Sequence, residues 1–105
     1  MQNDHRILHF AFGVSEPIRI PIGRELDLHP FAPRDIPSVV AEYIDAAVAA
    51  GFQDVRLVHG RGRGVQRGIV QAALERHPCV VEFWDDSRAH LGATIARIRP
   101  MQADS

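Results

Sequence analysis

A carboxylate and an imidazole lie close together in a segment with a strand-like pattern. Asp27 and His29 are two residues apart in Glu25–His29, where polar and apolar residues alternate as in a half-buried β-strand. Side chains at that spacing point to the same side of a strand. Histidine titrates near neutral pH, so a carboxylate that orients it would complete a proton-transfer pair. Asp27 and His29 are therefore candidate catalytic residues.

A second histidine, His59, directly follows the apolar segment Val55–Val58. A strand, a helix and a strand in succession give a right-handed crossover with parallel neighbouring strands. The carboxyl ends of such strands meet at one edge of the sheet, where the ligand sites of α/β proteins gather. We therefore expect Asp27, His29, His59 and residues 60–64 at one edge. Each histidine alone would more often be an ordinary turn residue, so the prediction depends on their convergence.

The loop Gly60-Arg61-Gly62-Arg63-Gly64 leads from this strand into the next helix. Its glycines would let the backbone approach a phosphate, and the helix N-terminus would add N–H donors and a partial positive charge. Arg61, Arg63 and Arg67 could each donate two hydrogen bonds to a phosphate. The loop lacks the lysine of a Walker A motif and the third glycine of a dinucleotide-binding motif. A solvated turn stays open as an alternative, as does a nucleotide site with Asp85 on a ribose.

The composition is that of a globular domain with a locally basic segment. The chain has 105 residues, enough for about one domain, and its 46% hydrophobic and 24% charged residues argue against disorder. All 12 basic residues are arginine, against 13 acidic residues, so the net charge is −1. This balance excludes a chain that is basic throughout. The absence of lysine excludes Walker-type phosphate binding and Schiff-base catalysis.

The sequence shows no sign of a membrane partner. Nothing near the N-terminus resembles a signal peptide, and no apolar run approaches the ~20 residues of a membrane span. We therefore expect a cytoplasmic protein. The single cysteine, Cys79, lies in an apolar run, so we expect a small buried core residue rather than a disulfide. The oligomeric state is not predictable from these patterns.

Strand and helix patterns alternate along most of the chain. The predicted order is a strand at 25–29, a helix from Ile36 to a cap at Gly51, a strand at 55–58, a helix at 65–76, and strands at 80–84 and 93–99. Two helices are too few to cover both faces of four strands, and each strand carries polar residues on one face. The fold class is therefore α/β: a two-layer β-α-β-α-β-β sandwich, with a four-stranded mixed sheet and both helices on one face.

The remaining residues flank this domain. Residues 1–23 are expected to form an N-terminal extension, with two strand-like segments, 7–12 and 18–22, joined by a turn. The domain itself is expected to span residues 24–99, and residues 100–105 are expected to be a tail.

Two motifs together resemble the small MutS-related (Smr) domain family. Leu26-Asp27-Leu28-His29 resembles its LDxH motif, and His59-Gly60-Arg61-Gly62-Arg63-Gly64, 30 residues later, resembles its HGxGxG motif. Arg67 is similar to an arginine that often follows the second motif. The resemblance covers about residues 24–99. It implies a fold similar to the C-terminal domain of bacterial translation initiation factor three, in agreement with the architecture above.

The resemblance also implies binding of DNA or RNA and cleavage of phosphodiester bonds by a nicking endonuclease or ribonuclease. Asp27, His29 and His59 would then be catalytic residues, with a histidine as general base or leaving-group acid. Residues Gly60 to Gly64 and Arg67 would bind the nucleic-acid backbone without reading its sequence. Outside the loop, the basic patch would extend to Arg88, Arg97 and Arg99.

The chain departs from the family pattern at three places. Pro30 stands where glycine is usual, Gln66 where leucine is common, and His90-Leu91 where two glycines are usual. These departures weaken the implied activity more than the implied fold. A non-catalytic DNA- or RNA-binding module that uses the same loop is therefore the alternative function.

Metal dependence stays open at this point. Asp27 would either orient a histidine or help to hold Mg²⁺ or Mn²⁺. Asp85 and Asp86 could hold such a hard cation together with phosphate oxygens, although a solvated acidic turn is the commoner explanation.

Overall fold

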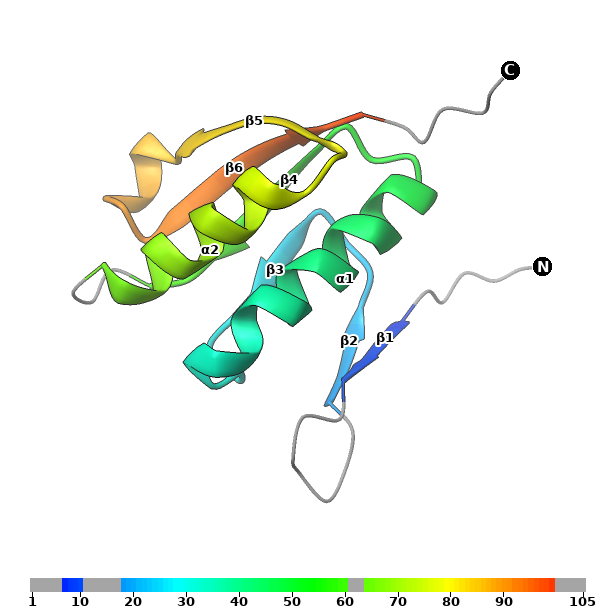
Figure 1. Ribbon diagram of the computed structural model, residues 1–105, viewed down its shortest axis with the longest axis horizontal. Helices are drawn as coiled ribbons and strands as arrows, with labels where there is room; N and C mark the ends of the chain where they lie inside the picture. Colours follow the sequence, from blue (N-terminus) through cyan, green and yellow to red (C-terminus); the bar gives the residue numbers. More distant parts are fainter. Residues whose placement is uncertain (1–6, 11–17, 61–63, 100–105) are drawn as a thin grey trace.

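The computed structural model describes residues 7–10, 18–60 and 64–99. These residues form two sheets and two α-helices (Figure 1). The strands are β1 (Ile7–Phe10), β2 (Ile18–Pro21), β3 (Glu25–Asp27), β4 (Asp54–Val58), β5 (Val80–Asp85) and β6 (Ala93–Ile98). The helices are α1 (Ile36–Ala49) and α2 (Val65–Arg76), with short 3₁₀ turns η1 (Pro33–Asp35) and η2 (Ser87–Ala89).

The main sheet is mixed and has the strand order β3-β4-β6-β5. β3 and β4 are parallel, with Asp27 opposite Val58, and β6 is antiparallel to both of its neighbours. The predicted four-stranded mixed sheet is confirmed. The expectation of parallel neighbours holds for β3 and β4 but not for β4 and β5, because β6 lies between them. Most of β6 is buried. Ala93 and Thr94 lie on opposite faces of the sheet and both are buried, as expected for a central strand.

Both helices lie on one face of the main sheet, so the predicted two-layer sandwich is also confirmed (Figure 1). Apolar residues at helical spacing form the buried stripe of α1: Ile36, Val39, Val40, Tyr43, Ile44, Ala47 and Val48. α2 contributes Val70, Ala73 and Leu74 to the same core, and the sheet contributes Leu26, Val55, Leu57, Ala96 and Ile98. No helix of the described residues covers the opposite face of the sheet.

The two N-terminal strands form a separate antiparallel pair, with Phe10 opposite Ile18. Each of the two predicted strand-like segments thus contains a strand, whereas the turn at 11–17 and the tail at 100–105 lie outside the described residues. The chain then enters β3, where the hydroxyl of the fully buried Tyr43 donates a hydrogen bond to the carbonyl of Gly23. This bond ties the start of β3 to α1.

No helix in the described part of the chain is long and apolar enough to cross a lipid bilayer. Cys79 packs against the core but stays half-buried, less than its apolar surroundings predict. The reason is its position in the connection between α2 and β5, outside both elements.

Candidate functional site

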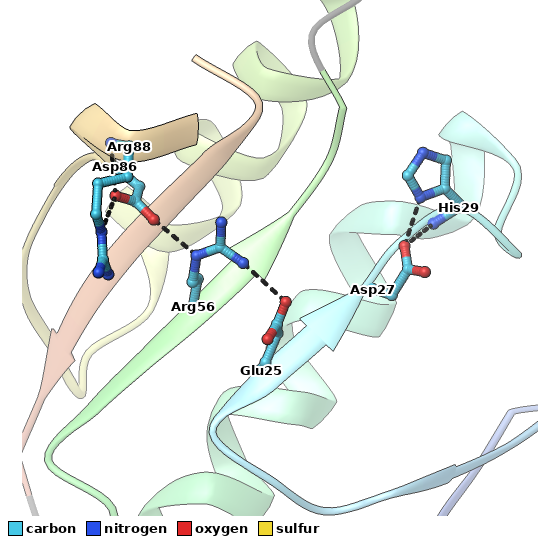
Figure 2. A network of polar contacts seen from close by, with 6 residues as sticks. All are labelled: Glu25, Asp27, His29, Arg56, Asp86 and Arg88. Carbon is cyan, nitrogen blue, oxygen red and sulfur yellow. Dashed lines mark hydrogen bonds and ion pairs between the residues drawn. The ribbon is translucent and has the colours of Figure 1, made fainter. Parts of the chain in front are cut away.

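Asp27 and His29 form a hydrogen-bonded pair where β3 ends (Figure 2). The carboxylate atom Oδ1 of Asp27 accepts hydrogen bonds from the backbone N–H of His29, at 2.9 Å, and from its ring atom Nδ1, at 2.6 Å. The backbone bond and the ring contact lower the pKa of Asp27. Because a carboxylate can only accept, Nδ1 carries the proton and neutral His29 has its lone pair on Nε2. The two side chains are 62% and 66% exposed, so this Asp27–His29 pair is open to solvent.

Nε2 of His29, which has no hydrogen-bond partner among the described residues, lies beside the start of the glycine loop. Gly60 has φ of +89°, a left-handed conformation that glycine adopts readily. A Cβ added to Gly60 would lie 3.6 Å from Nε2 of His29. The backbone N–H groups of His59 and Gly60 both donate to the carbonyl of Gly92, at 3.1 and 2.9 Å, and fix the loop against β6. The structure thus brings His29 and the loop backbone together at one edge of the sheet.

His59 lies on the helix-covered side of the sheet, away from the Asp27–His29 pair. Strand alternation places it on the same side as the buried Leu57, and only 3% of its surface is exposed. Both ring nitrogens are occupied: Nδ1 donates to the carbonyl of Gly60 at 3.1 Å, and Nε2 accepts from the hydroxyl of Thr94 at 2.9 Å. Burial lowers the pKa of His59. The structure therefore does not bring His59 into the open site that Asp27 and His29 share.

A polar network continues from His59 to α2. Gln71 donates from Nε2 to Oγ1 of Thr94 and to Oδ1 of Asp85, each at 3.0 Å. Because the carbonyl of Gly60 can only accept, Nδ1 of His59 carries the ring proton, and the hydroxyl of Thr94 donates to Nε2. The network therefore fixes the proton of neutral His59 on Nδ1.

Arg67, a predicted ligand of the nucleic-acid backbone, is joined to Asp85. Its Nε and Nη2 atoms donate to the two carboxylate oxygens at 2.7 and 2.8 Å, which is a bidentate ion pair. This pairing lowers the pKa of Asp85. Since Gln71 binds the same carboxylate, the two alternative roles of Asp85, as a ribose or a cation ligand, gain no support from the structure.

The middle of the loop, Arg61, Gly62 and Arg63, lies outside the described residues, so its phosphate contacts stay a prediction. Gly64 is the N-cap of α2, with φ of +83°, and its position has no side-chain cap. The first N–H groups of α2 therefore follow directly on the loop and have no acceptor within the helix.

A second polar chain crosses the open face of the sheet (Figure 2). Arg56 of β4 donates to Glu25 of β3 and to Asp86, which follows β5, each at 2.7 Å. Arg88 adds a backbone hydrogen bond to Asp86 at 3.0 Å. Within residues 7–10, 18–60 and 64–99, no group of three or more His, Cys, Asp or Glu side chains is placed to hold a metal ion. Asp85 and Asp86, the predicted cation ligands, are instead each paired with an arginine, Arg67 and Arg56.

Two residues of the network, Thr94 and Gln71, receive no role from the sequence patterns. A signal exists for Thr94, because alternation along β6 places it on the same side as the buried Ala96 and Ile98. A polar residue on a buried face needs a hydrogen-bond partner. No comparable signal marks Gln71, which lies among the polar residues of α2.

Known proteins resemble most of the chain. A family model described as the Smr domain matches residues 26–99. The chain is 34% identical over 80 residues to the endonuclease MutS2 of Enterococcus faecalis, a match that covers 74% of this chain and 10% of that protein. For the endonuclease MutS2 of Caldicellulosiruptor saccharolyticus the identity is 37% over 62 residues, which cover 57% of this chain and 8% of that protein. The chain thus spans about a tenth of the length of these curated relatives.

Two solved structures share the fold. The Smr domain of Thermus thermophilus MutS2 superposes with a TM-score of 0.69 at 30% identity, covering 74% of this chain and 100% of that chain. YdaL, a stand-alone small MutS-related protein from Escherichia coli, superposes with a TM-score of 0.66 at 24% identity, covering 72% of this chain and 64% of that chain. The second likeness is one of fold alone.

Proposed function

Since the chain belongs to the Smr domain family, we propose that it binds DNA or RNA and cleaves a phosphodiester bond, as a nicking endonuclease or ribonuclease. The relatives named endonuclease are much longer than this chain, so the proposal depends on the site that this chain itself contains. One observation carries it: the exposed Asp27–His29 pair presents an Nε2 atom beside the backbone of Gly60, with no hydrogen-bond partner in the described part of the chain.

In this proposal His29 is the general base. Its Nε2 atom takes the proton of the attacking water or ribose hydroxyl while the new O–P bond forms. Asp27 stabilises the resulting imidazolium through the 2.6 Å contact with Nδ1 and keeps the ring in the required tautomer. As the other P–O bond breaks, the departing oxygen is protonated by solvent, which reaches the exposed pair freely.

The glycine loop would hold the scissile phosphate. The uncapped N–H groups at the start of α2 lie at the C-terminal end of the glycine loop, and such groups bind anions well. Arg61 and Arg63 would add permanent positive charge, because an arginine stays protonated at any physiological pH. A phosphate held there would place its neighbouring oxygens near Nε2 of His29.

We assign His59 and Arg67 positioning roles in place of the direct roles that the motifs imply. His59 donates to the carbonyl of Gly60 and accepts from Thr94, so it holds the loop backbone beside His29. Arg67 holds the start of α2 against β5 through Asp85. Neither side chain needs to touch the substrate for these roles.

The test is cleavage of supercoiled plasmid and of single-stranded and structured RNA, with and without Mg²⁺ or Mn²⁺. His29→Ala should lose cleavage and keep binding. His90→Asn, which removes another exposed histidine, is the matched control and should keep both. Cleavage at the wild-type rate in His29→Ala would refute the assigned role. Binding without cleavage by the wild type, lost in the Arg61→Ala/Arg63→Ala variant, would establish the non-catalytic module instead.

A further inference from the structure

The open face of the main sheet carries an exposed tryptophan. Trp84 of β5 is 42% exposed, although tryptophan is highly buried in most proteins. Its neighbour Phe83 packs against the core, so strand alternation places Trp84 on the open face. Trp84 lies opposite Ile95 of β6, and Ile95 lies opposite Arg56 of β4. The indole ring therefore shares a face with the polar chain through Arg56 in Figure 2.

Arginine side chains lie near this ring, each within reach of a carboxylate. The guanidinium carbon of Arg97 is 5.9 Å from the ring centroid of Trp84, and the side chain of Arg88, four residues further along, is 84% exposed. The nearby carboxylates have partners, since Glu82 pairs with Arg97 at 3.1 Å and Asp86 with Arg56 at 2.7 Å. A phosphate backbone that crosses this surface would meet arginines and ion pairs, not bare carboxylates.

Trp84 lies within reach of a strand that is bound at the Asp27–His29 pair. The two positions are on the outer strands β3 and β5 of the same sheet. Across the sheet, Asp27 is level with Val58 and Ala93, whereas Trp84 is level with Ile95, two residues further along β6. The strand spacing and rise per residue give a separation of roughly 15 Å. A single strand of nucleic acid covers that distance in a few nucleotides.

We propose that Trp84 stacks on an unpaired base of the substrate, and that the preferred substrate is therefore DNA or RNA with a single-stranded segment. Nucleic acid as the ligand of this face follows from the proposed function. Aromatic rings on open sheet surfaces bind single strands in this way, because every base has a π-face. In a duplex the adjacent base pairs cover these faces, so only an unpaired segment can use Trp84.

The emission of Trp84 provides a direct test, because the chain contains one tryptophan. Oligothymidylate and oligouridylate should quench this emission, whereas a duplex of the same length should not. In anisotropy titrations with labelled oligonucleotides, Trp84→Leu should bind about tenfold more weakly, and Trp84→Phe should retain most of the affinity. Val81→Ala, which removes another exposed apolar side chain of β5, is the matched control and should bind as the wild type does.

Quenching that persists in His29→Ala would separate base stacking from cleavage, so this inference can stand even if the proposed chemistry fails. Three results would overturn it: binding without any change in Trp84 emission, equal quenching by the duplex, or no binding at all. A change in emission with protein concentration alone would place a second copy of the chain on this face and would also overturn it. The two oligonucleotides, compared with each other, report the preference for DNA or RNA.

Discussion

The ring atom Nε2 of His29 lies 3.6 Å from the point that a Cβ on Gly60 would occupy. Gly60→Ala would therefore place a methyl group against the proposed base and would also strain a backbone with φ of +89°. We expect at least tenfold slower cleavage, with a free energy of unfolding lower by about 1–2 kcal/mol. Cleavage rates and urea denaturation measure the two effects.

Gly68→Ala is the matched control for this substitution. Gly68 lies within α2, and a Cβ added there would meet nothing within 4 Å. Alanine is the better helix former, so the variant should be about 0.5–1 kcal/mol more stable and should cleave normally. If Gly60→Ala cleaved as fast as Gly68→Ala, the loop backbone would have no part in the site.

Asp27→Asn should slow cleavage by about a hundredfold or more with little effect on binding. The amide oxygen can still accept from His29, but it cannot stabilise the imidazolium, and the tautomer is no longer fixed by a charge. The pKa of Asp27 is lowered, so in the wild type the carboxylate is charged throughout the neutral range. Single-turnover rates and affinities, measured separately, distinguish the two effects.

Asp54→Asn provides the comparison. It removes an exposed carboxylate at the opposite end of the sheet, where β4 begins, and should leave the cleavage rate unchanged. Equal losses in both variants would mean that overall charge, not the Asp27–His29 pair, controls the rate.

Stability should fall as the pH is lowered below 6.5, in part because of His59. Its folded-state pKa lies below the ordinary value of 6.5, so the unfolded chain binds the proton more readily. The contribution of His59 is therefore complete above pH 6.5, decreases below it, and levels off below the folded-state pKa. In His59→Asn, urea denaturation across this range should show a shallower dependence on pH. An unchanged slope would contradict the neutral, buried state of His59.

Thr94→Val should reproduce the loss of loop positioning without touching either histidine. The nearly isosteric valine leaves Nε2 of His59 and one donor of Gln71 without a partner, at a cost of about 1–3 kcal/mol. Cleavage should fall with stability, and the Asp27–His29 pair should remain intact by NMR. If Thr94→Val were fully active while His59→Asn was stable but inactive, His59 would have to be a catalytic residue.

The arginines should differ in their contribution to the salt dependence of binding. Each phosphate contact that is lost reduces the slope of log K against log salt by about 0.7 for a single strand and 0.9 for a duplex. Arg61→Ala/Arg63→Ala should therefore lower the slope by the amount that two phosphate contacts contribute. Arg67→Ala should change the slope little, because Arg67 is bound to Asp85. A large slope change in Arg67→Ala alone would show that the substrate displaces Asp85.

Local patterns in the sequence were sufficient for the elements and for part of the site. The spacing of Asp27 and His29 predicts a shared side, and the structure shows a direct hydrogen bond, although β3 ends at Asp27 and a turn carries His29. For His59 the order of elements predicts the correct edge of the sheet. The strand alternation that buries Leu57 also places His59 on the helix-covered side of the sheet, and the sequence alone carried this signal.

Other features depend on contacts between distant segments, which local patterns do not encode. The ion pair of Arg67 with Asp85 joins α2 to the end of β5, and many other carboxylates could have served as its partner. The position of β6 between β4 and β5 depends on which edges of these strands pair with each other, and the residue pattern within a strand does not determine that. The stacking surface at Trp84 follows from this strand order, because β5 becomes the outer strand beside β6.

The central position of β6 has a consequence for the synthesis of the protein. β6 follows every other element of the domain in the chain, yet it pairs with both β4 and β5, and Gly92 just before it holds His59 and Gly60. While the nascent chain lacks this segment, the facing edges of β4 and β5 stay unpaired and the loop has no anchor. We therefore expect the site to form late in folding, once residues up to Ile98 are available to pair with β4 and β5.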